Sequence, residues 1–134
     1  MSSFHKRYFL NKDVAENGNW IDFGDGLAVC VRRANSMHTQ ATRKRLDAEY
    51  QHRKDADGEY PEDVVNEIGR RVMAESIIIG WKGVADENGE EIACTPENIC
   101  KVLTLYEDFG TEVFQASVMR TNFQKVVREA DLGN

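Results

Sequence analysis

The sequence predicts a mainly α-helical fold of the α+β class, with about four helices packed around a central apolar helix and a small β-hairpin. Apolar residues recur at three- and four-residue steps between Pro61 and Ile79, which is the period of a helix with one buried side. Further striped segments follow Pro96. Near the amino end, two segments of alternating character flank Gly24-Asp25-Gly26, whose glycines accept the positive φ of a hairpin turn.

Length and composition indicate one soluble domain. The chain has 134 residues, of which 41% are hydrophobic and 30% charged, as in ordinary globular proteins. No apolar run approaches the ~18–20 residues that span a bilayer, and the amino-terminal region lacks the apolar core of a signal peptide. We therefore expect a cytoplasmic protein. The expected parts are a loosely ordered segment at 1–17, a single helical domain with its hairpin at 18–130, and a frayed tail at 131–134.

The amino-terminal half is expected to hold the hairpin and two helices. An isolated hairpin is marginal in water, so it must pack on helices or pair with another chain. The first long helix has a thin apolar side and is expected to be mostly exposed. In order, we expect a hairpin at 19–33, a helix at 37–54 capped by Asn35 or Ser36, a turn at 55–58, and a central helix at 61–79.

The stretch from Ile79 to Asn98 connects the central helix to the last pair of helices. Glycine is common just past a helix end, so Gly80 is expected to end the central helix. Trp81 and Val84 are then expected to be buried anchors on an extended run. The turn that follows, at 86–89, ends in Asn88-Gly89, a pair suited to positive φ.

The second half of this stretch is expected to return as a short strand and then begin a helix. Ile92 and Cys94 alternate with polar or small neighbours, as strand residues do. Thr95 suits the N-cap, Pro96 the first helical position, and Glu97 the positive end of the helix dipole. We expect helices at 96–105 and 112–129, the second capped by Asp108 or Thr111, with Phe114 and Phe123 on its core side.

Two acidic turns partly resemble calcium loops. Asp55-x-Asp57-Gly58 and Asp86-x-Asn88-Gly89 share their first residues with an EF-hand, but an EF-hand needs glycine at its sixth position and a bidentate Glu at its twelfth. Glycine is the fourth residue in both segments. We therefore interpret them as turns.

No catalytic, cofactor-binding or metal-binding motif is recognisable. The chain has no nucleophile elbow, phosphate loop, zinc-protease motif or dinucleotide fingerprint. Cys30, Cys94 and Cys100 lack metal-ligand spacing and are interpreted as reduced side chains of a non-secreted protein. We expect a non-enzymatic protein without cofactor or metal.

Charge is distributed unevenly. The chain carries a net charge of −6, yet residues 32–54 have seven basic and two acidic side chains and so carry +5. Such asymmetry favours self-association or a charged protein partner. Binding of nucleic acid through this basic helix is the alternative function. The expected contact residues, chosen for their apparent exposure, are Phe4, Tyr8, Phe9, Arg32, Arg33, Arg43, Lys44 and Arg45, with the hairpin edge as a further pairing site.

The sequence also resembles tail assembly chaperones of long-tailed, siphovirus-type bacteriophages. In that family an apolar helix runs into Gly-Trp, followed by an acidic-glycine turn, a Ser/Thr cap and Glu-Asn at the start of the next helix. Residues 18–33 look like the family's amino-terminal hairpin, and the resemblance covers most of 17–123. The matching motif residues are Gly80, Trp81, Gly83, Val84, Asp86, Gly89, Ile92, Thr95, Glu97 and Asn98.

The resemblance implies a chaperone that acts before the phage tail is built. Such proteins coat and solubilise the tape measure protein, help recruit tail tube subunits, and are absent from the mature virion. It also implies the cytoplasm of the infected bacterial host, a homo-oligomer, and a longer form made by ribosomal frameshifting. We assign the motif residues from Gly80 to Asn98 to the fold rather than to partner contact.

Overall fold

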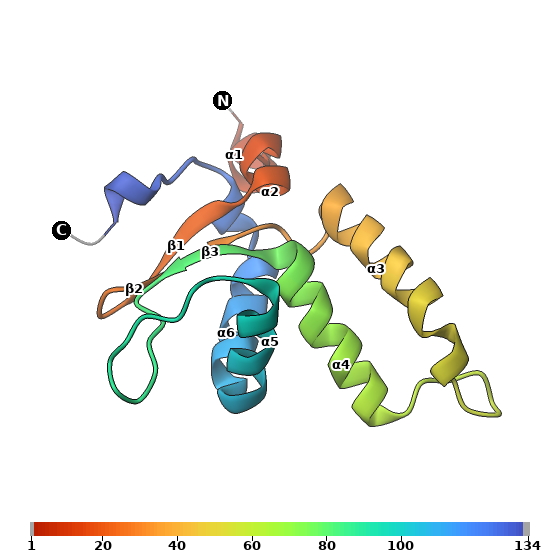
Figure 1. Cartoon of the computed structure of the whole chain (residues 1–134). Helices are drawn as coiled ribbons and strands as arrows, with labels where there is room; N and C mark the ends of the chain where they lie inside the picture. Colours follow the sequence, from red (N-terminus) through yellow and green to blue (C-terminus); the bar gives the residue numbers. More distant parts are fainter. Residues whose placement is uncertain (1, 133–134) are drawn as a thin grey trace.

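The computed structural model describes residues 2–132, which build helices around a small antiparallel sheet (Figure 1). This confirms the mainly helical α+β class. The helices are α1 (Ser3–Tyr8), α2 (Lys12–Asn17), α3 (Met37–Tyr50), α4 (Glu62–Val72), α5 (Pro96–Leu105) and α6 (Glu107–Val118). The strands are β1 (Asn19–Gly24), β2 (Leu27–Val31) and β3 (Ile78–Lys82).

The predicted hairpin is present, and a third strand extends it. β1 and β2 pair antiparallel on either side of the Gly24–Gly26 turn, and β3 pairs antiparallel with β2, opposite β1. The prediction that Gly80 ends a helix is therefore wrong, because Gly80 lies within β3 and pairs with Cys30. An added Cβ at Gly80 would lie 3.6 Å from the ring of Trp20, an ordinary van der Waals contact, so the indole lies directly beside this position of the sheet.

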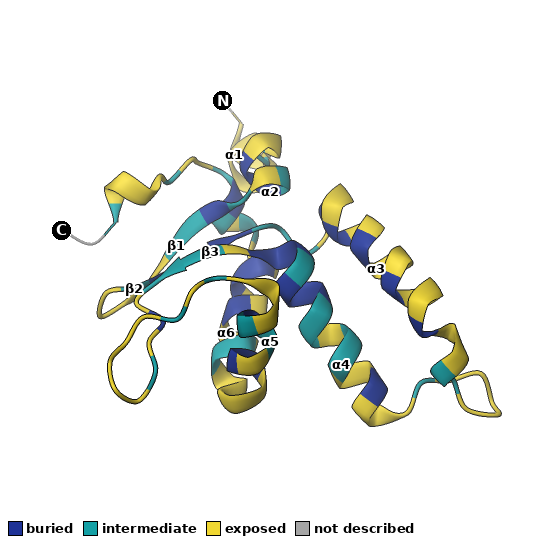
Figure 2. Cartoon of the chain, in the orientation of Figure 1, coloured by how far each residue is buried: buried dark blue, intermediate teal, exposed yellow. Residues whose placement is uncertain are grey.

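The central helix ends earlier than predicted and gives way to a wider turn. α4 ends at Val72 and continues as a π-helical turn, Met73–Ile77, before entering β3. The hydroxyl of Ser76 donates to the carbonyl of Val72 at 2.6 Å, and Ile77 is fully buried. This turn and the end of α4 form the centre of the core, whereas the first part of α4 extends away from it (Figure 2).

Helix α3 lies beside α4 and is exposed on its outer side (Figure 2). Its buried residues, Thr39, Thr42, Leu46 and Tyr50, recur at three- and four-residue steps. Ser36 is the N-cap, as predicted, and accepts a hydrogen bond from the backbone N–H of Thr39 at 3.1 Å. Half of this buried face is therefore threonine, which explains why the apolar stripe looked thin in the sequence.

The amino-terminal segment 1–17 contains α1 and α2. Val14 and Ala15 of α2 are buried in the core, while α1 has no buried residue. The side-chain amide of Gln124 donates to the backbone carbonyls of Lys6 and Phe9 and so attaches α1 to the carboxyl-terminal part of the chain. The tail expected at 131–134 lies partly outside the described residues.

The carboxyl-terminal half agrees with one predicted helix and corrects the other. α5 has the predicted bounds and the Thr95 cap. The last helix is present, but its predicted bounds, 112–129, and its predicted caps are wrong, because α6 starts at Glu107 directly after Tyr106 and ends at Val118, without a capping side chain. Phe123 does reach the core, fully buried, but from a short 3₁₀ turn rather than from a helix.

Candidate partner-binding surfaces

Contacts of Trp81 hold the stretch 78–98 together and join it to α6. The indole nitrogen of Trp81 donates to the carbonyl of Ile92 at 2.7 Å, and the Trp81 ring meets Phe109 edge-on at 6.3 Å. Trp81 is half-buried rather than fully buried, whereas Val84 is buried as expected. The expected strand at Ile92 and Cys94 is wrong, since only an isolated bridge joins Ala85 to Glu91.

Other motif residues fix the turn and the next helix. Asp86 accepts hydrogen bonds from the backbone N–H groups of Asn88 and Glu90, and Gly89 has φ 78°. Asp55 makes the same contacts with Asp57 and Glu59, so both acidic segments are turns, as predicted. Side chains at the start of α5 make further contacts. The hydroxyl of Thr95 caps the helix by accepting from the backbone N–H of Asn98, the side-chain amide of Asn98 donates to the carbonyl of Ala93, and Glu97 lies in the first turn.

The expected contact residues at the amino end are exposed. Phe4, Tyr8 and Phe9 are 73%, 50% and 44% exposed. The rings of Phe4 and Tyr8 lie 5.1 Å apart, and the guanidinium of Arg120 lies over Tyr8 at 4.9 Å. With Lys6 and Arg7 on the same helix, α1 forms an aromatic and positively charged surface, here called the basic end.

The basic stretch 32–54 is largely engaged within the chain. The Arg32 guanidinium donates to the backbone carbonyls of Glu16 and Ser76, and its backbone N–H donates to Ile77. Ser76 and Ile77 end the π-helical turn, and the last carbonyls of a helix have no partner within it. Arg32 therefore joins α2, β2 and the π-helical turn. Arg33 is half-buried, and its backbone N–H donates to the carbonyl of Ala15.

Ion pairs occupy more of these charges. Arg45 pairs with Glu75 at 2.7 Å, and Arg53 pairs with Glu67 at 2.9 Å. Arg43 and Lys44 are exposed and have no ion-pair partner among the described residues. Arg43 and Lys44 of α3 therefore remain as exposed basic side chains without an ion pair in the described part of the chain, which is less than the continuous basic face that the sequence suggested for nucleic acid.

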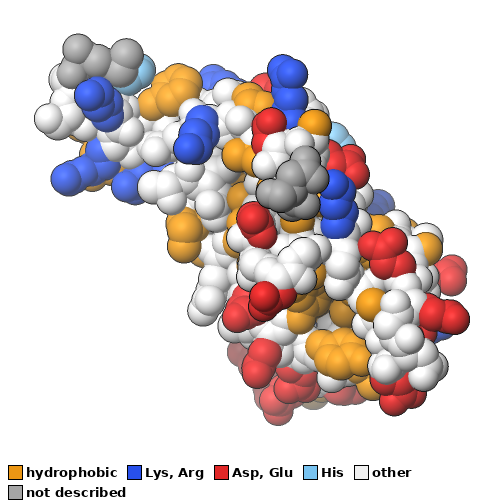
Figure 3. All heavy atoms as spheres, turned by 90° about the vertical axis from the view of Figure 1, so that its left-hand side faces the viewer, with side chains coloured by type: hydrophobic (Ala, Val, Ile, Leu, Met, Phe, Trp, Pro, Cys, Tyr) orange, Lys and Arg blue, Asp and Glu red, His pale blue; other side chains and the backbone are white. Residues whose placement is uncertain are grey.

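The opposite end of the molecule is apolar and acidic. At the α5–α6 junction, Leu105 and Tyr106 are 73% and 48% exposed and border a surface hollow of about 620 Å³. The first turns of α6 add Glu107, Asp108 and Glu112, all exposed. This surface, Leu105–Glu112, is here called the acidic end. Figure 3 shows Lys and Arg around the end with α1, and Asp and Glu gathered at the other end with hydrophobic atoms exposed between them.

A groove runs between α4 and α6. It has a volume of about 820 Å³. Its floor is buried and apolar, with Val72, Ile77 and Leu103, and its rims carry Val65 and Phe114, which are 52% and 42% exposed. Val65 belongs to the apolar stripe that follows Pro61, and Phe114 was expected on the core side of the last helix, so the exposure of both is a correction. Side chains that line the groove also include Arg43, Asn66, Arg70, Met73, Glu107, Thr111 and Gln115.

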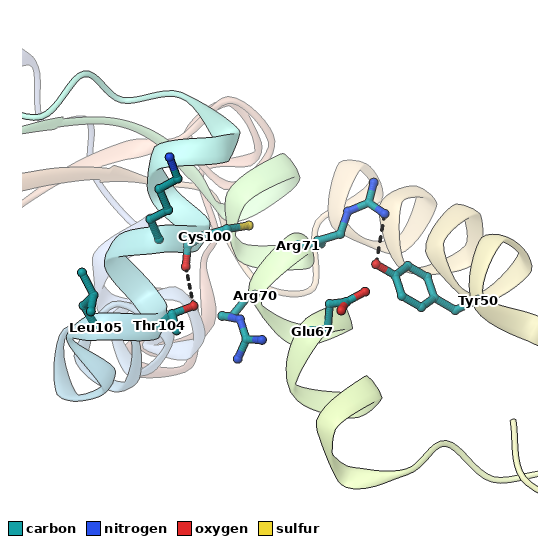
Figure 4. Close-up of a pocket in the computed structure, with 8 residues that line it drawn as sticks. Tyr50, Glu67, Arg70, Arg71, Cys100, Thr104 and Leu105 are labelled. Carbon is teal, nitrogen blue, oxygen red and sulfur yellow. Dashed lines mark hydrogen bonds between the residues drawn. The ribbon is translucent and has the colours of Figure 1, made fainter. Parts of the chain in front are cut away.

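A second hollow of about 600 Å³ lies between the end of α3, α4 and α5 (Figure 4). Arg71 extends from α4 toward α3 and donates to the hydroxyl of Tyr50 at 3.3 Å, to Glu75 and to Glu49. Burial raises the pKa of the Cys100 thiol, which disfavours the thiolate needed of a nucleophile. The contacts of Arg71 with Glu49, Glu75 and Tyr50 stabilise the packing of α3 on α4.

The comparison with known families adds the origin of the chain. The model of the YdaY prophage protein matches residues 34–134. The chain belongs to this family. It is therefore a phage-derived protein, and this confirms the coarser part of the resemblance, which is phage origin. The match begins after the hairpin and covers α3 through α6. Comparison with curated proteins and with solved structures gave no match.

Within the described part of this family member, no helix is both long and apolar enough to cross a membrane. The sequence did not single out the α4–α6 groove as a surface. One signal for it was available: Gly69 interrupts the helical stripe of α4, where glycine is unfavourable. Phe114 gave no such signal, because an apolar residue at helical spacing is usually buried.

Proposed function

We propose that this prophage protein is a tail assembly chaperone, which coats the tape measure protein of its phage, keeps it soluble and helps recruit tail tube subunits. Its action is non-enzymatic protein–protein binding in the host cytoplasm. The resemblance of residues 80–98 to that family supports this proposal, and so does membership of a prophage family.

The observation that carries the proposal is the placement of exposed apolar side chains at two ends of opposite charge. The basic end carries Lys6 and Arg7, with Arg120 over Tyr8, and the acidic end carries Glu107, Asp108 and Glu112. The basic end of one copy is complementary to the acidic end of the next, and each end has large apolar groups to bury. When two different surfaces of the same chain bind each other, each copy can add a further copy. Unless the rotation between neighbouring copies closes a ring, the copies form an open, extended array.

Such an open array suits a long partner. Tape measure proteins are long and helical, with apolar stripes that aggregate when bare. Many copies arranged along one chain bind it with avidity even when each single contact is weak. The alternative, binding of nucleic acid through α3, has less support because Arg32, Arg45 and Arg53 are engaged within the chain.

Co-expression tests the proposal. The tagged chain is produced together with the tape measure protein of the same prophage, and the soluble fraction is purified and its stoichiometry measured. We expect a soluble complex with many copies of this chain per tape measure protein. A tape measure protein that stays insoluble while the tagged chain purifies alone would contradict the proposal.

A further inference from the structure

We propose that the α4–α6 groove binds one amphipathic helix of the client protein, with a small residue over Gly69 and a carboxylate directed to Arg43 and Arg70. The inference deepens the proposed function, on which it rests for the identity of the client. The groove walls are helices of 11 and 12 residues. At about 1.5 Å per residue they extend roughly 17 Å, the length of three helical turns.

The shape of the groove suits a helix. Its residues on α6, Glu107, Gly110, Thr111, Phe114 and Gln115, recur at three- and four-residue steps. Those on α4 do the same. Two facing rows of this kind leave a groove into which the ridge of a third helix fits. The exposed rims, Val65 and Phe114, would be buried by an apolar stripe lying between them.

Gly69 indicates how closely the occupant approaches. A glycine inside a helix costs about 1 kcal/mol relative to alanine. An added Cβ at Gly69 would meet nothing within 4 Å, so packing within the chain does not require the glycine. At Gly110, by contrast, an added Cβ would lie 3.1 Å from Leu103. Gly69 therefore leaves open space on the groove wall, and close approach by a docked backbone explains it.

The charges of the groove define the occupant further. Arg43 of α3 and Arg70 of α4 line it, and neither has an ion-pair partner among the described residues. Glu107, in the first turn of α6, is the acidic group of the lining. Two arginines beside an apolar surface favour a carboxylate, which a guanidinium binds through paired hydrogen bonds. The occupant is thus an apolar-striped helix with acidic flanks.

A synthetic helix tests this inference directly. The probe is a fluorescein-labelled peptide of about 18 residues, long enough to be helical, with a leucine stripe, a central alanine and glutamate flanks. A matched peptide has lysine flanks. Binding to the intact chain is measured by fluorescence anisotropy. We expect the acidic peptide to bind and the basic peptide to bind at least about tenfold more weakly.

Substitutions place the peptide in the groove. Gly69→Leu fills the open space and is expected to weaken binding of the acidic peptide at least about tenfold. Thr104→Leu adds the same side chain at an exposed position of α5 outside the groove and should leave binding unchanged. Circular dichroism and thermal melting confirm that both variants are folded. Arg43→Glu with Arg70→Glu should reverse the preference between the two peptides.

Several results would overturn the inference. Equal binding of both peptides would show that charge does not select the occupant. Unchanged binding by folded Gly69→Leu, or equal loss with Thr104→Leu, would place the peptide elsewhere. If Gly69→Leu instead converts an oligomer into a monomer in sedimentation, the occupant is a second copy of this chain. If the acidic peptide binds but the co-expressed tape measure protein stays insoluble, the proposed function is rejected, whereas the inference that the groove binds a helix still holds.

Discussion

The indole nitrogen of Trp81 donates a 2.7 Å hydrogen bond to the carbonyl oxygen of Ile92. The bond connects the end of β3 with the segment that returns from the acidic turn, before Thr95 begins α5. The same side chain meets Phe109 at the start of α6. One residue thus connects the sheet, the loop and the last helix, which explains why a tryptophan follows the glycine of β3.

Replacement of Trp81 is expected to destabilise the fold. Trp81→Ala should cost about 2–3 kcal/mol, less than for a fully buried aromatic because the side chain is half-buried. Trp81→Phe keeps most of the packing and loses the hydrogen bond, at a cost of about 1 kcal/mol. Urea unfolding measures both values. Equal costs for the two variants would mean that the hydrogen bond, rather than the packing, is the main contribution.

Gly83 is expected to tolerate no side chain. It has φ 79°, and an added Cβ would overlap the carbonyl of Gly26 in the hairpin turn. Gly89 has almost the same φ, 78°, but an added Cβ there meets nothing within 4 Å. Gly83→Ala should therefore cost more than Gly89→Ala by at least about 1 kcal/mol in urea unfolding. If both variants lose a similar free energy of unfolding, backbone strain at positive φ explains both losses and the overlap with Gly26 adds nothing.

The charge network between α3 and the π-helical turn is expected to make stability depend on pH. Burial opposes ionisation of Glu75, but hydrogen bonds from Arg71 and Arg45 outweigh it and lower the pKa of Glu75. The stabilisation is therefore fully present above the unfolded-state pKa of about 4.3 and is lost as pH falls through the lower folded-state pKa.

Glu75→Gln isolates this contribution. At pH 7 the variant should be less stable by about 1.5–3 kcal/mol, the range for hydrogen bonds to charged groups. The difference from the parent chain should shrink as the pH falls below about 4. Urea unfolding from pH 3 to pH 7 on both chains gives the comparison. A difference that stays constant over this range would show that Glu75 does not titrate as inferred.

Gly69→Ala is expected to stabilise the protein. The position lies in the middle of α4 with open space around it, so alanine removes the helix penalty without a clash. The gain should be about 0.5–1 kcal/mol, seen as a higher Tm. Gly110→Ala, where an added Cβ would lie 3.1 Å from Leu103, is the matched helical control and should gain less. A lower Tm for Gly69→Ala would mean that the helix bends or packs there in some other way.

End-to-end association is expected to depend on charge. Lys6→Glu with Arg7→Glu reverses the basic end, and Glu107→Lys with Asp108→Lys reverses part of the acidic end. Each variant alone should sediment as a smaller species than the parent chain at low salt, and higher salt should weaken the parent assembly. A mixture of the two variants should associate again, because each reversed end then meets its complement. A mixture that stays dissociated would argue against this contact.

The sequence by itself determined the local features of this protein. The caps at Ser36 and Thr95, the acidic turns at Asp55 and Asp86, and the hairpin turn around Asp25 all follow from residues within a few positions of one another. Their hydrogen bonds are short-range in the chain, so the same side chains that make them are visible in the sequence.

Only the tertiary structure decided what happens beyond these local contacts. Ile78 and Ile79 suit a helix end or a strand equally well, and they form the start of β3 because β2 offers an edge about fifty residues earlier in the chain. The exposure of Phe114 has a similar cause, since α5 separates α4 from α6 and leaves a groove where the sequence suggests a core. Helical periodicity identifies which side of a helix is apolar, but the arrangement of its neighbours decides whether that side is covered.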